Sequence, residues 1–316
     1  MFIRRLILAA ALVTVAAIVP AGLARDVEAD QCTPAHPCPS PSPSPTDPRR
    51  PGDPVITAAG DIAARIPSEA TKATANLVAS INPTVALTLG DNQYPDGALA
   101  EFRTGYRPTW GDFKWKTRPT PGNHEYHLPR AAGYFEYFDS RAPGRWYSFN
   151  VGSWHLISLN SNCAEIGGCT AGTPQYEWLK ADLASHPARC TLAYWHHPRW
   201  SSGSHHGNFS PVGPFVQLLY NAGAEVILSG HEHNYERYAP QTPGGALHRA
   251  RGIVQFVAGT GGYSHYGFGP PDTNSRVRNG STHGVLRMTL RPGSYDFRFR
   301  PIAGSSFTDA GSGTCH

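Results

Sequence analysis

Short apolar runs alternate with amphipathic segments along the chain from residue 55 onwards. Residues 55–59 and 85–89 are apolar runs of strand length, and a polar turn follows each of them. Between them, residues 68–80 have the pattern of a helix, with Ser68 as its N-cap and Glu69 in its first turn. This strand–helix–strand order predicts that the two strands lie parallel and adjacent in one sheet.

The same alternation continues to the C-terminus and predicts an α/β domain over residues 55–316. One helix is expected to begin at Pro174 with Thr173 as its cap, and another is expected at residues 214–221. The segments 95–118, 126–145 and 199–213 are predicted as loops, and their aromatic residues are equally compatible with stacking on a substrate and with packing inside the loops. The remaining predicted strands are 146–151, 155–160, 190–195, 225–229, 253–258, 285–290 and 295–300.

The N-terminus has the features of an export signal. Arg4 and Arg5 precede an apolar run over residues 6–18, and residues 22–24 fit a cleavage site, so residues 1–24 are predicted to be a signal peptide. The apolar run is shorter than the roughly 20 residues that span a bilayer, and an uncleaved anchor is the alternative. We therefore expect a secreted or cell-surface protein with no stable membrane span after signal cleavage. Arg4-Arg5 leaves the choice between Sec and twin-arginine export open.

Residues 25–54 are predicted to be a Pro/Ser-rich linker. The alternating Pro and Ser of residues 39–45 favour an extended polyproline conformation over a helix or a sheet ladder. Such a segment can act as a spacer from a cell surface, or it can be a tail without a spacing role.

Composition and charge exclude several classes of protein. Hydrophobic residues make up 40% of the chain and charged residues 16%, with 33 Gly and 29 Pro, which suits a loop-rich α/β fold and not a helical bundle. The net charge of +4 falls to about +2 when Arg4 and Arg5 are removed with the signal. This small excess argues against a nucleic-acid partner. The oligomeric state is left open.

The chain has six cysteines, an even number that predicts disulfides in an exported protein. The spacing makes two local pairs plausible and would leave a third pair to anchor the C-terminus, although sequence alone does not fix the connectivity. These pairs are Cys32–Cys38, Cys163–Cys169 and Cys190–Cys315.

Polar clusters rich in Asp, Asn, His and Tyr appear at intervals, most of them directly after an extended apolar run. Because the carboxyl ends of parallel strands meet at one edge of a sheet, we expect these clusters to come together there and form a metal site. The clusters are Gly60-Asp61, Gly90-Asp91-Asn92-Gln93-Tyr94, Gly122-Asn123-His124-Glu125, His196-His197 and Gly230-His231-Glu232-His233.

The order of these clusters resembles the calcineurin-like metallophosphoesterase superfamily and, within it, the purple acid phosphatases. The family blocks DxG, GDxxY, GNH with D or E, VxxH and GHxH match the segments that begin at residues 61, 90, 122, 193 and 230. Ala63 replaces the glycine of the first block, and Ala193 replaces the valine of the fourth. Related zinc, manganese or iron enzymes have His where Ala63 stands and lack Tyr94, so the coupled change favours the purple subtype.

The resemblance implies a four-layer α/β/β/α sandwich with two mixed sheets packed face to face, and a dinuclear metal centre. Fe(III) would be bound by Asp61, Asp91, Tyr94 and His233. A divalent Fe, Zn or Mn ion would be bound by Asp91, Asn123, His196 and His231. Glu125 would orient His124, which would protonate the leaving group or stabilise phosphoryl oxygens. The residues expected to face the substrate are Asn92, His205 and His206, with His205 also as a catalytic candidate.

The implied activity is hydrolysis of small phosphate monoesters by metal-activated hydroxide attack. The alternatives are a phosphodiesterase that acts on nucleotides or lipid headgroups, and a phosphate-binding protein without turnover. We expect His197 to pack locally, Arg237 either to fix the loop behind the histidines or to reach a phosphate, and residues 259–262 to form a tight turn under the site.

Overall fold

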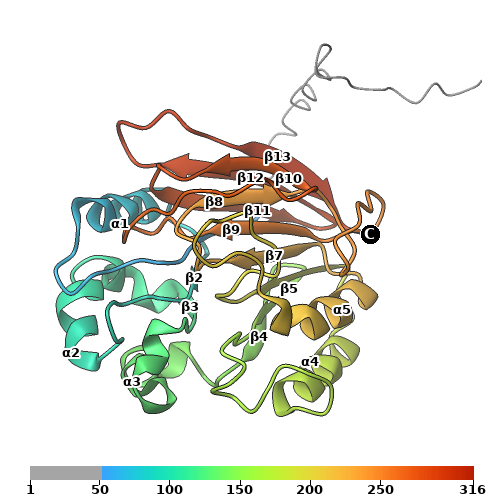
Figure 1. Ribbon diagram of the computed structural model, residues 1–316, viewed down its shortest axis with the longest axis horizontal. Coiled ribbons are helices and arrows are strands. Elements are labelled where there is room, and N and C mark those ends of the chain that lie inside the picture. Colours follow the sequence, from blue (N-terminus) through green and yellow to red (C-terminus); the bar gives the residue numbers. More distant parts are fainter. Residues whose placement is uncertain (1–51) are drawn as a thin grey trace, which may run out of the picture. The chain divides into compact units, whose positions relative to one another are not determined.

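The computed structural model describes residues 52–316 (Figure 1). The predicted signal peptide, almost all of the predicted linker and the predicted Cys32–Cys38 pair lie outside these residues. No helix in the described part of the chain is long and apolar enough to cross a membrane.

The strands form two mixed sheets. The first has the order β13-β12-β11-β1-β2-β3, with β1, β2 and β3 parallel and the other neighbours antiparallel. It consists of β1 (Val55–Ala59), β2 (Val85–Leu89), β3 (Thr117–Thr120), β11 (Gly284–Arg291), β12 (Ser294–Pro301) and β13 (Ala310–Thr314).

The second sheet has the order β10-β8-β9-β7-β6-β5-β4, with β5, β6, β7 and β9 parallel. It consists of β4 (Tyr147–Val151), β5 (Trp154–Ser158), β6 (Cys190–Tyr194), β7 (Val226–Ser229), β8 (Tyr235–Tyr238), β9 (Val254–Ala258) and β10 (Ser275–Asn279).

The two sheets pack face to face, because side chains from both contribute to one buried cluster. Ile56 and Leu87 of the first sheet meet Leu192 and Phe256 of the second in this cluster. The opposite face of each sheet packs against helices in a separate cluster. The expected four-layer α/β/β/α sandwich is therefore confirmed.

Helices cover the outer faces of the sheets. Figure 1 shows α1 (Glu69–Ile81), α2 (Leu99–Glu101) and α3 (Ala132–Phe138) on the side of β2 and β3, and α4 (Pro174–Ser185) and α5 (Gly213–Asn221) beside the second sheet. Ser68 caps α1 as predicted, since its hydroxyl accepts the Thr71 N–H at 3.0 Å. Thr173 is the N-cap residue of α4 and Pro174 its first residue, as predicted, but Thr173 makes no side-chain capping bond, because its hydroxyl donates to the Thr170 carbonyl at 2.6 Å.

All three segments predicted as loops contain helical structure, and residues 199–213 contain the turn η6 (Ser210–Val212) and the first residue of α5. Residues 95–118 include α2, the helical turns η1 (Phe102–Tyr106) and η2 (Trp110–Lys116) and the start of β3, while residues 126–145 include α3 with the short turns η4 (Pro129–Ala131) and η5 (Asp139–Arg141). Their aromatic residues Tyr106, Trp110 and Tyr134 are buried against the first sheet. These rings therefore form part of the core instead of a substrate surface.

Two disulfides join described residues, Cys163–Cys169 and Cys190–Cys315, as the spacing predicted. The second ties the C-terminal end of the chain to the first residue of β6.

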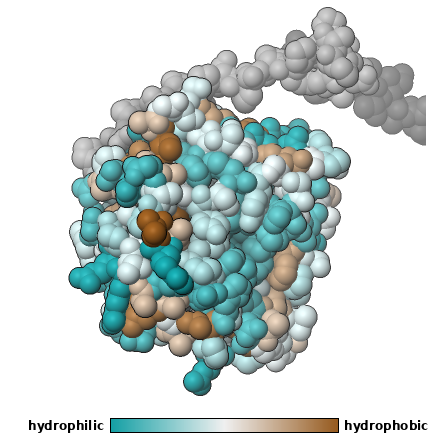
Figure 2. Space-filling view, turned by 60° about the vertical axis from the view of Figure 1, so that its left-hand side comes forward, coloured by the Kyte–Doolittle hydropathy of each residue, from teal (hydrophilic) through white to brown (hydrophobic). Residues whose placement is uncertain are grey.

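Figure 2 shows that the face around α1 and α2 is largely hydrophilic, with separate hydrophobic spots between the polar side chains.

Candidate metal centre

The five clusters lie at the carboxyl ends of parallel strands. Asp61 follows β1, Asp91 follows β2, Asn123 follows β3, His196 follows β6 and His231 follows β7. Asp61, Asp91 and His231 have positive φ values of 60°, 46° and 71°, a conformation that is costly for residues with a Cβ and is concentrated at functional sites. β1, β2 and β7 are therefore each followed by a turn in which a polar residue of the site has left-handed backbone geometry.

One group of donor atoms surrounds the Tyr94 phenol. Its oxygen lies 2.9 Å from Asp61 Oδ1, 3.0 Å from Asp91 Oδ2 and 3.0 Å from His233 Nε2. Asp61 and His233 also approach each other, with 3.3 Å between Oδ1 and Nε2. The structure thus brings together all four residues that the sequence proposed for the first ion.

A second group surrounds the His196 imidazole. Its Nε2 lies 3.1 Å from Asn123 Oδ1, 3.1 Å from His231 Nδ1 and 3.3 Å from Asp91 Oδ2. These are the four residues proposed for the second ion. Asp91 Oδ2 belongs to both groups, which is the arrangement that a bridging carboxylate requires.

Hydrogen bonds made by the other atoms of these side chains orient the donor atoms. His196 Nδ1 donates to the Leu89 carbonyl at 2.8 Å, so that its Nε2 faces the centre. His233 Nδ1 bonds to Ser264 Oγ at 2.7 Å, so that its Nε2 also faces the centre. Asp61 Oδ2 accepts the His231 backbone N–H at 2.9 Å. Such contacts fix ring orientation and tautomer in protein metal sites.

Two glycines allow the backbone to approach the carboxylates. A Cβ at Gly122 would lie 2.1 Å from Asp91 Oδ1, and a Cβ at Gly259 would lie 2.5 Å from Asp61 Oδ2. The predicted tight turn at residues 259–262 therefore does pack against the site.

Burial and neighbouring charges tune these groups. Burial disfavours ionised Asp91, but the adjacent His196 outweighs it and holds the pKa of Asp91 below its usual range. Burial acts against ionised His196 too, yet Asp91 raises the pKa of His196 to about 9. Burial and the charge on His196 lower the pKa of His231, which keeps that imidazole neutral. Burial and the two carboxylates raise the pKa of Tyr94 well above its usual value, so a phenolate there requires a compensating cation.

This donor set fits metal ions. Two of the groups of His, Asp and Glu side chains close enough to share an ion lie here, Asp61/Asp91/His196 and His196/His197/His231. The first set of donors is rich in hard oxygen atoms, whereas the second combines carboxylate and amide oxygens with two imidazoles, a mixture that suits a divalent transition metal.

His124 lies at the edge of the centre. Its Nδ1 bonds to the Pro95 carbonyl at 2.6 Å, and its Nε2 lies 3.9 Å from Asp91 Oδ2. The expected orienting role of Glu125 is not found. The Glu125 carboxylate is fully buried and accepts three backbone N–H groups, from Asn92 at 2.8 Å, Gln93 at 3.1 Å and Gly122 at 2.7 Å. It therefore joins the turn after β2 to the turn after β3.

The expected substrate contact of Asn92 is not found, and the structure favours the first of the two alternatives for Arg237, that it fixes the loop. Asn92 is fully buried and its amide donates to the Thr120 carbonyl at 3.1 Å, so it shapes the turn. Arg237 forms a two-pronged ion pair with Asp309, with 2.7 Å between Nε and Oδ2, so it stabilises the loop and does not face the centre.

His205 and His206 are exposed side chains beside the proposed ligands. The His206 ring stacks on His231, with 3.9 Å between ring centroids. The His205 ring stacks on Tyr266 at 4.1 Å, and Tyr266 in turn stacks on His233 at 4.0 Å. Both histidines therefore lie beside the proposed ligands His231 and His233.

Sequence reasoning missed the aromatic residues of the loop after β9. Tyr266 contacts His233, and Tyr263 lies flat on Tyr94 with 3.7 Å between centroids and 3° between planes. Only the position of the loop, directly after the turn at residues 259–262, pointed to this region.

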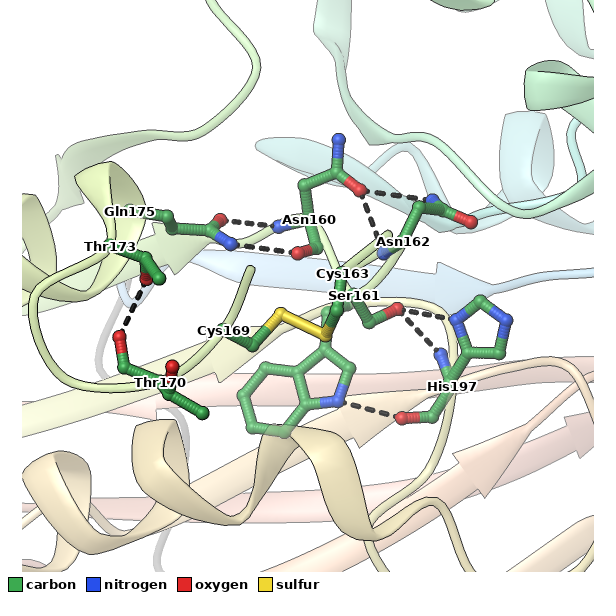
Figure 3. The surroundings of a disulfide bond; sticks show 10 residues. Asn160, Ser161, Asn162, Cys163, Cys169, Thr170, Thr173, Gln175 and His197 are labelled. Carbon is green, nitrogen blue, oxygen red and sulfur yellow. Dashed lines mark hydrogen bonds between the residues drawn. A yellow bond between two sulfur atoms is a disulfide. The ribbon is translucent and has the colours of Figure 1, made fainter. Parts of the chain in front are cut away.

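His197 packs locally, as predicted, in the surroundings of the Cys163–Cys169 disulfide (Figure 3). Ser161 Oγ accepts the His197 backbone N–H at 2.9 Å and bonds to its Nδ1 at 2.7 Å. Asn162 next to it donates to the Pro121 carbonyl at 3.4 Å. The segment that leads into this disulfide therefore packs against two of the site-forming turns.

A further group, His155, Asp182 and His186, links β5 to α4. His155 Nε2 lies 2.8 Å from Asp182 Oδ2, and the two imidazoles stack at 4.8 Å with 13° between planes. Nearly parallel rings do not point their nitrogens at a common ion, so we interpret this group as a structural ion pair.

Comparisons with known proteins agree with this architecture. The family model of the calcineurin-like phosphoesterases matches residues 54–235, more than half of the chain. Purple acid phosphatase 15 of Arabidopsis thaliana is 36% identical over 97 residues, which are 29% of this chain and 18% of that protein. Acid phosphatase type 7 of Danio rerio is 31% identical over 122 residues, 31% of this chain and 28% of that protein. The chain thus matches less than a third of the length of these relatives.

Two solved structures share the fold. The purple acid phosphatase PPD1 from yellow lupin seeds has a TM-score of 0.63 at 18% identity, covering 83% of this chain and 53% of its own. GAP50, described as the anchor in the inner membrane complex of Plasmodium, has a TM-score of 0.64 at 15% identity, covering 81% and 88%. At such identities the structures show the fold alone, whereas the family model and the matched sequence blocks show the kinship. The chain belongs to the calcineurin-like phosphoesterase family, with purple acid phosphatases among its relatives.

Proposed function

We propose that this protein is a metal-dependent phosphatase that hydrolyses small phosphate monoesters at a dinuclear centre. The observation that carries the proposal is the position of Asp91 Oδ2, which lies 3.0 Å from the Tyr94 phenol and 3.3 Å from His196 Nε2. One carboxylate oxygen therefore belongs to two complete donor sets. This feature supports a pair of neighbouring ions in preference to a single ion.

The proposed first ion is Fe(III), held by Asp61, Asp91, Tyr94 and His233, because phenolate and carboxylate are hard donors. The proposed second ion is divalent Fe, Zn or Mn, held by Asp91, Asn123, His196 and His231. When bound, the ions supply Lewis acidity to the phosphate oxygens and to the attacking water.

The remaining roles belong to side chains around the ions. The Nδ1–H of His124 donates to the Pro95 carbonyl, and its other nitrogen faces the centre, where it can carry the proton for the leaving alkoxide. His205 and His206 present N–H groups at the mouth of the site, where they can bind phosphate oxygens. Glu125 acts at a distance, by holding the turn that carries Asp91.

We also propose that the protein is exported, with residues 1–24 as the signal peptide, residues 25–54 as a linker and residues 55–316 as the catalytic domain. The disulfides Cys163–Cys169 and Cys190–Cys315 support an oxidising compartment, where such bonds persist. Recovery of the mature chain from the medium or cell surface, beginning at Arg25, tests this; cytoplasmic retention would contradict it.

A metal analysis combined with a substrate panel tests the proposed activity. Purified protein should contain two metal ions per chain, one of them iron, and should hydrolyse p-nitrophenyl phosphate faster than bis-p-nitrophenyl phosphate. Preference for the bis ester would show a phosphodiesterase. Stoichiometric phosphate binding without turnover by fully loaded protein would show a binding protein and refute the proposal.

A further inference from the structure

Glu232 lies between two proposed metal ligands, His231 and His233, but its side chain points to a different part of the molecule. The side chain is fully buried, and its Oε1 accepts the backbone N–H groups of His206 at 2.6 Å and Gly207 at 2.5 Å. Its Oε2 is buried and makes no hydrogen bond within the described residues. All hydrogen bonds of this carboxylate group therefore go to the loop that carries His205 and His206.

The close approach of the Glu232 carboxylate to this loop depends on Gly203, a glycine of the same loop. A Cβ at Gly203 would lie 2.2 Å from the carboxylate carbon of Glu232 and 2.3 Å from its Oε2. The base of the loop is fixed separately, because Glu236 Oε2 accepts the Ser202 N–H at 2.8 Å. The Gly267 carbonyl accepts the Ser204 N–H at 3.1 Å, and Glu232 is the group that holds the two following amides, His206 and Gly207, next to the two histidines.

The loop tip and the metal-ligand turn are also in contact on the solvent side. His206 stacks on His231 at 3.9 Å, and Tyr266 lies between His205 and His233, 4.1 Å and 4.0 Å from their ring centroids. These contacts involve only the rings of the two exposed histidines and do not fix the backbone of the loop. The two charge-assisted bonds to Glu232 fix the backbone from which they project.

We propose that Glu232 is a positioning residue that locks His205 and His206 in place relative to the metal ligands. The inference rests on the proposed function, since it assumes that these histidines bind the phosphate of the substrate. Without the hydrogen bonds to Glu232, the loop must be ordered each time a substrate binds. The free energy of this ordering weakens substrate binding without changing the reacting groups.

Kinetics of the metal-loaded enzyme test the proposal. Glu232→Ala should raise KM for p-nitrophenyl phosphate about ten-fold and change kcat less than three-fold, at unchanged metal content. Glu232→Gln retains an acceptor oxygen and should restore KM to within about three-fold of wild type. Gly203→Ala displaces the same carboxylate without removing it and should raise KM in the same way.

Glu225 provides a matched control, because it is a buried glutamate that accepts two backbone N–H groups, from Thr191 and His316, away from the site. Glu225→Ala should lower stability and leave KM unchanged. An equal rise of KM in Glu225→Ala and Glu232→Ala would reduce the role of Glu232 to general stability and overturn the proposal.

Hydrogen exchange gives a readout that does not depend on activity. In Glu232→Ala, protection of the His206 and Gly207 amides should fall at least about ten-fold, while amides in β6 and β7 keep theirs. Unchanged protection or unchanged KM would overturn the proposal. If the wild-type enzyme is inactive on every phosphate ester, the proposed function fails, and the exchange experiment still decides whether Glu232 holds the loop.

Discussion

Replacing Glu125 separates two roles that this residue can have. The sequence suggested that it orients His124, whereas the structure shows it bonded to the backbone of Asn92, Gln93 and Gly122. Glu125→Gln keeps one acceptor oxygen and replaces the other with an amide donor. Because Oε1 accepts two N–H groups and Oε2 accepts one, the variant that retains most contacts places its NH₂ group against the Gly122 N–H.

The cost follows from that contact. The variant loses the hydrogen bond from the Gly122 N–H and leaves this buried backbone donor without a partner. Removing one partner of a buried hydrogen bond costs about 1–3 kcal/mol, so we expect a loss of about 1–3 kcal/mol in the free energy of unfolding. His124→Ala should cost little stability, because its side chain is 29% exposed, but should slow turnover about 10²–10⁴-fold.

Guanidinium unfolding of both variants, with metal ions at saturation, measures this difference. Glu125→Gln should unfold at a lower midpoint with an unchanged m-value, and at full metal content its turnover should fall less than that of His124→Ala. The opposite pattern, with stability within about 1 kcal/mol of wild type and a kinetic defect equal to that of His124→Ala, would show that Glu125 acts through His124 and would refute our interpretation.

Three other predictions concern the metal ligands and the fold. Tyr94→Phe should abolish the visible absorption of the iron-loaded protein, because the band requires a phenolate bound to Fe(III); a coloured variant would exclude Tyr94 as the ligand. Gly122→Ala places a methyl group 2.1 Å from Asp91 Oδ1 and should reduce bound metal well below two ions per chain in elemental analysis, whereas full loading would contradict the bridge. Burial raises the pKa of Glu225 to about 7 from an ordinary 4.5, so the folded state binds the proton more tightly. The contribution of Glu225 to the unfolding free energy should therefore be greatest below pH 4.5 and fall by about 3 kcal/mol as pH rises to 7, so the difference in unfolding free energy between wild type and Glu225→Gln should change by that amount; identical pH profiles of the two proteins would show that Glu225 has no such effect.

Some features of the site were predictable because they are local in the sequence. An apolar run that ends in Asp61, Asp91 or His231 predicts both the strand and the polar turn after it, and parallel strands bring such turns to one edge. Tyr94 was predictable as a ligand as well, because a residue three positions after Asp91 is close enough to bind the same ion. The strands β3, β8, β10 and β13 were not predicted, because short sequences such as those of β10 and β13 have no sustained apolar alternation.

The sequence by itself determined the order of most of the elements and pointed to the proposed metal ligands, since both depend on short-range patterns and on the ends of strands. Only the tertiary structure decided which partner each buried charge has. Glu125 bonds to the turn after β2, Glu232 bonds to the loop at residues 203–207, and Arg237 pairs with Asp309, 72 residues away. A carboxylate that leaves water must find donors, and the donors within reach are set by packing between segments that are distant in the chain.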